Sequence, residues 1–140
     1  MTDRITVEEL NRFFAEEFPQ TPVRALELTP MRALVRHEVG EAQLRPGRTV
    51  SGPVMMTTAD VGLYAAILGE IGLVALTVTT SFTMNFMRKP VEGRALIGEC
   101  VLLKLGKTLA VGEVSIYSEG SSEVVAHAVG TYAIPPPHLR

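Results

Sequence analysis

The fold is decided by residues 51–72, SGPVMMTTADVGLYAAILGEIG. The first residues are typical of a helix start, because Ser51 can cap the first turn and Pro53 suits a turn in which its missing N–H costs nothing. The residues that follow are apolar on nearly every side of the predicted helix, which ends at about Gly69 or Gly72. Such a helix is typically enclosed by other structure. We therefore expect it at the centre of the molecule.

The segments around this helix predict an antiparallel sheet. Residues 23–39 read as two short strands or one broken strand, residues 40–52 as a loop, and residues 6–18 as an amphipathic helix with a capping box of Thr6 and Glu9. After the central helix come three or four segments with β-type alternation: residues 75–88, 94–106, 108–120 and 123–134. Their order favours a meander. A sheet curled around the central helix would bury the helix and one face of each strand.

The composition is typical of a single folded α+β domain covering residues 1–140, with its core at about 20–134. Hydrophobic residues make up 46% of the chain and charged residues 20%. The formal net charge of −2 provides no positive field to attract nucleic acid or an anionic membrane, and Asp60 interrupts the apolar run that a membrane span would need. A single cysteine, Cys100, and an N-terminus without a signal pattern predict a cytoplasmic protein.

Asp60 does not fit the apolar helix that contains it. The only other aspartate in the chain is Asp3, near the N-terminus. A carboxylate in apolar surroundings is costly unless it is paired, and burial is expected to raise its pKa toward the range useful for a general base. The alternative is structural, with Asp60 capping a backbone group or bonding a threonine such as Thr57. Glu70, at the end of the same helix, is expected to be solvated.

The residues around Asp60 resemble a known family. Residues 51–60, with LRPGRTV at 44–50 and TTSFTMNFMRKP at 79–90, are similar to the PaaI-like branch of the hotdog-fold acyl-CoA thioesterases. The resemblance covers about residues 20–134 and implies a sheet wrapped around a central helix. It also implies that Asp60 attacks the thioester or activates a water, while the Gly52 N–H polarises the thioester carbonyl at the helix N-terminus.

The chain departs from the family pattern at three positions. The family's histidine is replaced by Ser51, its second glycine by Pro53, and its asparagine by Arg45. We expect Ser51 to keep a weaker hydrogen bond, and Arg45 either to pair with Asp60 or to hold an anionic group of the substrate. These replacements leave open a lowered activity, a different acyl group, or a non-catalytic protein that binds acyl groups or coenzyme A.

Several other residues are candidates for substrate binding. By resemblance, three of them end the strand that follows the helix, near the phosphates of coenzyme A, although an ordinary solvated turn explains them equally well: Asn85, Arg88 and Lys89. Lys104 and Lys107 can add to such a patch or simply keep an edge soluble. Tyr64 and Phe82 either line an acyl tunnel, together with nearby methionines, or belong to the core.

No metal or separate cofactor is expected, and coenzyme A enters only as part of the substrate or product. His37 and His127 have no partner at ligand spacing, and Cys100 in an apolar strand is expected to behave as a small hydrophobic residue. The resemblance implies a homodimer with active sites at the subunit interface, or a homotetramer of two dimers. The acyl group, and whether its carrier is coenzyme A or an acyl carrier protein, remain open, and a dehydratase of the same fold has little support.

Overall fold

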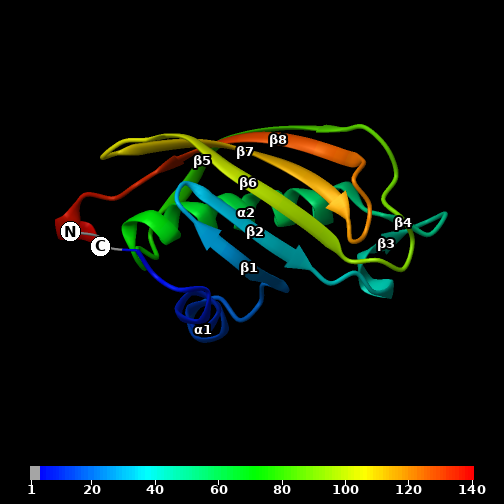
Figure 1. The fold of residues 1–140 in the computed structure, drawn as a ribbon, viewed down its shortest axis with the longest axis horizontal. Coiled ribbons are helices and arrows are strands. Elements are labelled where there is room, and N and C mark those ends of the chain that lie inside the picture. Colours follow the sequence, from blue (N-terminus) through cyan, green and yellow to red (C-terminus); the bar gives the residue numbers. More distant parts are fainter. Residues whose placement is uncertain (1–3) are drawn as a thin grey trace.

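The computed structural model describes residues 4–140, which form a curved sheet wrapped around one long helix (Figure 1). The helices are α1 (Val7–Glu17) and α2 (Gly52–Ile71). The strands of the main sheet are β1 (Val23–Thr29), β2 (Arg32–His37), β5 (Val78–Phe86), β6 (Leu96–Leu105), β7 (Leu109–Ser118) and β8 (Val124–Ala133). The predicted hotdog architecture is confirmed: α2 lies against one face of the sheet, and α1 lies beside β1 (Figure 1).

The order of the strands differs from the expected meander at one strand. The six-stranded sheet has the order β1-β2-β6-β7-β8-β5, and all neighbours are antiparallel. Strands β6, β7 and β8 follow one another as predicted. The prediction is wrong for β5, which pairs with β8 instead of β6, because α2 carries the chain across the sheet to the far edge. The return connection then brings β6 to the free side of β2.

The limits of α2 follow the local sequence signals. The Ser51 hydroxyl accepts a hydrogen bond from the Val54 N–H at 3.4 Å, and the helix ends at Gly72, whose φ of 91° suits glycine. By length and composition α2 is apolar enough to cross a membrane, but 61% of its most apolar window is buried in the fold. The sheet makes room for it at Gly112 and Gly130, which lie opposite each other on β7 and β8. A Cβ atom at either glycine would come within 3 Å of the Leu63 side chain.

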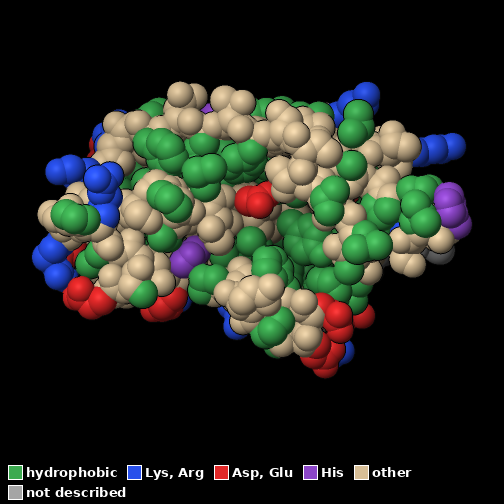
Figure 2. All heavy atoms as spheres, turned by 180° about the vertical axis from the view of Figure 1, so that it is seen from behind, with side chains coloured by type: hydrophobic (Ala, Val, Ile, Leu, Met, Phe, Trp, Pro, Cys, Tyr) green, Lys and Arg blue, Asp and Glu red, His purple; other side chains and the backbone are tan. Residues whose placement is uncertain are grey.

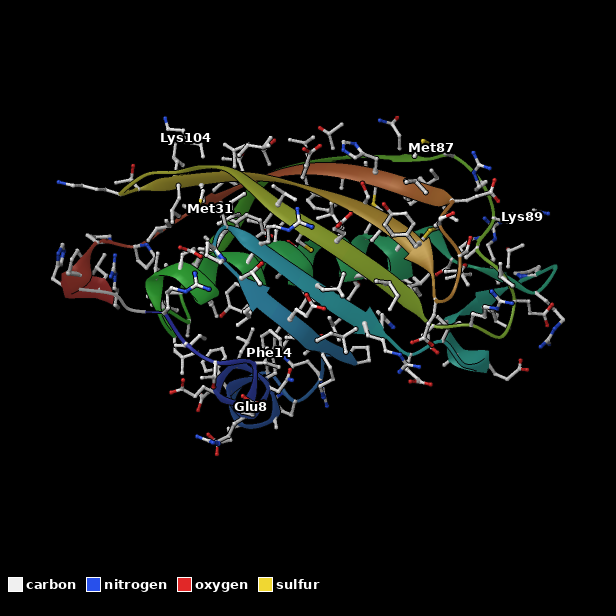
Figure 3. The ribbon with its side chains drawn as sticks, in the orientation of Figure 1. Glu8, Phe14, Met31, Met87, Lys89 and Lys104 are labelled. Atoms are coloured by element: carbon white, nitrogen blue, oxygen red, sulfur yellow. The ribbon has the colours of Figure 1, made fainter. Side chains whose placement is uncertain are left out.

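Helix α1 is held by its N-cap and by one edge of the sheet. The predicted capping box is present, with the Glu9 N–H donating to Thr6 Oγ1 at 3.0 Å and the Thr6 N–H donating to Glu9 Oε1 at 2.9 Å. The Asn11 side chain forms two hydrogen bonds with the backbone of Ala25 on β1, at 3.0 and 2.9 Å. Phe14 points from α1 toward the body of the molecule in Figure 3 and is fully buried.

Two local expectations need correction. Residues 40–52 are not only loop: they contain a short hairpin of β3 (Leu44–Arg45) and β4 (Thr49–Val50), because Pro46 and Gly47 supply a tight turn. Glu70 is not simply solvated, since its carboxylate accepts the Met31 N–H at 2.8 Å and pairs with Arg4. These partners offset the unfavourable position of an anion at a helix C-terminus.

Candidate active site

Asp60 lies on α2 and is held by two residues from the sheet. Its Oδ1 atom accepts a hydrogen bond from Thr79 Oγ1 on β5 at 2.7 Å and a short one from the Tyr132 hydroxyl on β8. The same hydroxyl lies 2.6 Å from the carbonyl oxygen of Asp60. The expected structural alternative was a neighbour such as Thr57 on the same helix. The threonine that bonds Asp60 is instead Thr79, which lies on β5, 19 residues further along the chain.

Tyr132 remains a hydrogen-bond donor to Asp60. It is 2% exposed, and this burial, reinforced by the charge of Asp60, holds the pKa of the Tyr132 phenol far above its usual range. The hydroxyl therefore keeps its proton at any physiological pH and fixes one oxygen of the carboxylate. The sequence contained one indirect signal for this contact: a buried tyrosine in an alternating strand needs a partner for its hydroxyl, but nothing local identifies that partner.

Asp60 is only partly buried and lines two hollows. The first is a cavity of about 360 Å³ that also contacts Tyr64 and α1, and it is called the α1 cavity below. The second is a groove of about 350 Å³ lined by Pro53, Met56, Thr57, Asp60, Thr79 and Phe82. Tyr64 and Phe82 therefore both lie beside Asp60, in different hollows. Viewed from behind, acidic atoms are exposed in the middle of a face rich in hydrophobic side chains (Figure 2).

A third hollow, of about 530 Å³, lies at the N-terminus of α2 and is called the basic cavity below. Its polar and helix-start residues are Arg45, Thr49, Gly52, Pro53, Arg88 and Lys89. Gly52 is the first residue of the helix, and within residues 4–140 no hydrogen bond from its N–H is present. The ring of Phe86 covers it, 3.4 Å from where a Cβ atom would stand. The positive N-terminal end of α2 and three basic side chains therefore line the same hollow.

The predicted phosphate-binding residues are only partly brought together. Within the described chain, Arg45 and Lys89 form no ion pair, whereas Arg88 pairs with Glu123 at 2.8 Å. Arg45 does not pair with Asp60. Asn85 is opposite His127 in the sheet, so its side chain lies on the face that points away from α2. Lys104 lies at the other end of the molecule from Lys89, and so does not join the basic cavity (Figure 3).

The Gly52 N–H and the Asp60 carboxylate do not meet within one chain. Eight residues separate them on α2, which corresponds to about 12 Å along the helix axis. They also line different hollows, and only Pro53 lines both the basic cavity and the groove beside Asp60. The Ser51 hydroxyl is directed to the backbone as a helix cap. Within one chain, the two groups therefore lie in separate hollows.

The remaining reactive side chains of the described residues lie elsewhere. Cys100 is fully buried, and burial raises the pKa of its thiol far above the usual range. His37 is also buried, which lowers its pKa, and its Nδ1 lies 2.7 Å from the Glu38 carbonyl. His127 contacts Glu113 at 2.9 Å. Over residues 4–140 there is no group of three or more His, Cys, Asp or Glu that could hold a metal ion.

Comparisons with known proteins agree with this architecture. The family model of the thioesterase superfamily matches residues 47–125, which is more than half of the chain. The chain therefore belongs to the thioesterase superfamily. A candidate thioesterase from Silicibacter sp. TM1040 shares 45% sequence identity, over 94% of this chain and 93% of that chain, with a TM-score of 0.87. No curated protein matches the sequence.

More distant structures share the fold. The PaaI protein from the phenylacetic acid degradation operon of E. coli is 20% identical over 91% of this chain and 92% of its own, with a TM-score of 0.71. A protein from Streptococcus mutans, solved bound to acetyl CoA, is 19% identical over 81% of this chain and 89% of its own, with a TM-score of 0.69. The chain therefore resembles the hotdog thioesterases, including PaaI proteins, in its fold as well as in its sequence motif.

Proposed function

We propose that the protein is an acyl-CoA thioesterase in which Asp60 acts as general base or nucleophile and the Gly52 N–H polarises the thioester carbonyl. The observation that carries this proposal is the position of Asp60. Its carboxylate is fixed by Thr79 and the buried Tyr132, and it is open to two hollows in a member of the thioesterase superfamily. A carboxylate needed only for stability would not have to line two hollows.

We propose that Gly52 and Asp60 act together in an active site formed by two copies of the chain. A carbonyl oxygen must lie about 3 Å from its N–H donor, with its carbon close to the attacking group, and a separation of about 12 Å does not allow both. A twofold axis brings Gly52 of one copy to Asp60 of the other and creates two equivalent sites. The midpoint between these residues is Met56, which is an apolar side chain with 42% exposure. An exposed methionine at that point suits a position near the axis.

The edge of the sheet supports the same dimer. Strand β5 is the last strand of the sheet, and its outer edge has no partner within the described chain. Unpaired edges are usually covered, and an antiparallel second copy of β5 would continue the sheet. Large apolar side chains flank this edge with exposures of about half: Leu76, Val78, Phe86 and Met87. We therefore propose a homodimer in the cytoplasm, and sedimentation shows whether two dimers associate further into a tetramer.

The proposed reaction has two routes that use the same residues. As general base, Asp60 removes a proton from water while the water oxygen attacks the thioester carbon. As nucleophile, a carboxylate oxygen forms an acyl anhydride, which water then hydrolyses. In both routes the carbon–sulfur bond breaks, coenzyme A leaves as its thiolate and takes up a proton, and the Gly52 N–H stabilises the oxyanion. Arg45, Arg88 and Lys89 are suited to the phosphates of coenzyme A.

A second candidate is a non-catalytic protein that binds acyl groups or coenzyme A. It is favoured by one observation: Ser51, which replaces the family's histidine, has its hydroxyl directed to the helix cap. Hydrolysis of a panel of acyl-CoAs by the wild type and by Asp60→Asn separates the two candidates. We expect kcat to fall by about 10² to 10⁴-fold in the variant, because asparagine keeps the hydrogen-bond acceptor but removes the charge. Equal rates for both proteins would rule out the enzyme and favour the binding protein.

A further inference from the structure

The α1 cavity beside Asp60 is bordered by an element outside the part of the chain that matches the family. Its lining includes residues of α2 and of the segment leading into β5, such as Val61, Tyr64 and Thr77. It also includes Phe13 and Glu17 of α1 and the C-cap residue Phe18. The match to the superfamily covers residues 47–125, so α1 is an addition to the matched region. The volume of about 360 Å³ is at the small end of ligand pockets.

Helix α1 forms a fixed wall of this cavity. The rings of Phe14 and Tyr64 stack with their centroids 6.3 Å apart and an interplanar angle of 17°. The Tyr64 hydroxyl donates to the Ala75 carbonyl at 3.0 Å, so Tyr64 is held at both ends. On its other side, α1 is tied to β1 by Asn11. Phe13 and the C-cap residue Phe18 therefore belong to a wall that is anchored both to α2 and to β1.

The lining of the cavity suits an uncharged, mainly apolar group. Four aromatic rings and several aliphatic side chains line it, while Glu17 and Asp60 contribute carboxylates that repel a negative charge. The Thr77 side chain is 4% exposed, and its Oγ1 is the one buried side-chain polar atom without a hydrogen-bond partner in the described chain.

We propose that the α1 cavity holds the acyl group of the substrate and that α1 sets the longest acyl chain accepted, with Phe18 and Phe13 as the end stop. Glu17 disfavours acyl groups that end in a carboxylate. This inference rests on the proposed thioesterase function, because it places the thioester carbon at Asp60. The substrate class is then an acyl-CoA whose acyl group is uncharged, apolar and of short to medium length.

Binding of non-hydrolysable S-alkyl-CoA thioethers of increasing length, measured by calorimetry, tests this proposal without depending on catalysis. For the wild type we expect the affinity to rise about threefold to fourfold per methylene until the chain reaches α1, and then to fall. The chain length at which the affinity stops rising is called the break. In Phe18→Ala we expect the break at chains at least about two carbons longer, because truncation removes the end stop. Leu139→Ala, at an exposed apolar residue outside the cavity lining, is the control and keeps the wild-type break.

A second pair of variants tests the charge at the cavity. Glu17→Gln is expected to bind a thioether ending in a carboxylate up to about fivefold more tightly, while neutral thioethers bind as before. Glu16→Gln is the matched control, since Glu16 is the preceding exposed glutamate of α1 and is outside the cavity lining. Phe13→Ala repeats the length test if Phe18→Ala does not fold.

The outcomes separate this inference from the function on which it rests. An unchanged break in both phenylalanine variants would overturn the role of α1, even if the enzyme hydrolyses acyl-CoAs. If no acyl-CoA is hydrolysed but the break moves with Phe18→Ala, the thioesterase proposal fails while the assignment of the acyl cavity stands.

Discussion

Asp60 and Gly52 lie on the same helix but are held in different ways. Asp60 is fixed by two side chains from distant strands, Thr79 on β5 and the buried Tyr132 on β8. Gly52 is placed by local sequence alone, through the Ser51 cap and Pro53, and its cavity is bordered by exposed cations. The comparison indicates that the fold itself positions the carboxylate proposed to react, whereas the end of α2 has a backbone donor and a positive field beside exposed cations.

The largest expected effect tests whether the two regions work only across subunits. Asp60→Asn and Gly52→Val, in which the new side chain would crowd the place of the carbonyl beside Phe86, are each expected to be inactive alone. After mixing, half of the dimers contain both variants, and each mixed dimer has one intact site made of Gly52 from one copy and Asp60 from the other. We therefore expect about a quarter of the wild-type hydrolysis rate. A mixture that stays inactive, with subunit exchange confirmed by mass spectrometry, would contradict the shared site.

The next largest effect concerns how Asp60 is held. Tyr132→Phe removes one donor to the carboxylate, so we expect kcat to fall by about tenfold with a small change in KM. Tyr117→Phe is a matched control, because the Tyr117 hydroxyl also contacts a carboxylate, that of Glu99, at 3.4 Å, outside the cavities that contain Asp60. Steady-state kinetics and thermal melting of both variants provide the readout. Equal losses of kcat in the two would show that Tyr132 does not position Asp60.

A smaller effect is expected at the basic cavity. Lys89→Ala should raise KM for acyl-CoA by about fivefold and leave kcat unchanged, because an exposed cation contributes to binding through charge alone. The increase should shrink at high salt, where exposed charges are screened. Lys104→Ala, at the opposite end of the molecule, is the control (Figure 3). A drop in kcat with constant KM would remove the contrast between the two regions.

The smallest effect compares the two donors to Asp60. Thr79 is exposed, so water can replace its hydroxyl, and Thr79→Val is expected to lower kcat by about twofold to threefold. The control is Thr80→Val, which removes a hydroxyl that bonds the Thr131 carbonyl at 3.2 Å and does not contact Asp60. Both variants are measured with the same acyl-CoA. A loss in Thr79→Val as large as that in Tyr132→Phe would show that burial is not what distinguishes the two contacts.

The features that could be predicted from sequence are those with local causes. Ser51, Pro53 and Gly72 mark the ends of α2 within a few residues, and Thr6 with Glu9 marks the start of α1, because capping depends on neighbours in the chain. The position of β5 could not be predicted in this way. Strand alternation shows which face is buried but not which strand lies alongside, and chain order alone suggested the wrong neighbour.

The residues of the candidate site also divide into those that local sequence identifies and those that depend on how the strands pair. The motif spacing identified Gly52 and Asp60, and the structure places Arg45, Arg88 and Lys89 in one cavity with Gly52. Thr79 and Tyr132 were missed, because their contact with Asp60 depends on how β5 and β8 pair at one edge of the sheet. The same pairing places Asn85 on the opposite face, since neighbouring residues of a strand point to opposite sides.

The hydrogen bonds of Asn11 with Ala25 have a consequence for how far the protein can assemble. Ala25 lies on β1, the strand at the other edge of the sheet, and the Asn11 amide occupies both its backbone N–H and its carbonyl. The pairing of β1 with β2 is also shifted between Ala25 and Glu27. An edge that is capped and irregular resists the addition of another strand. In the proposed dimer only the β5 edge is left for a partner, so joining two copies would end the growth of the sheet and would not start a fibre.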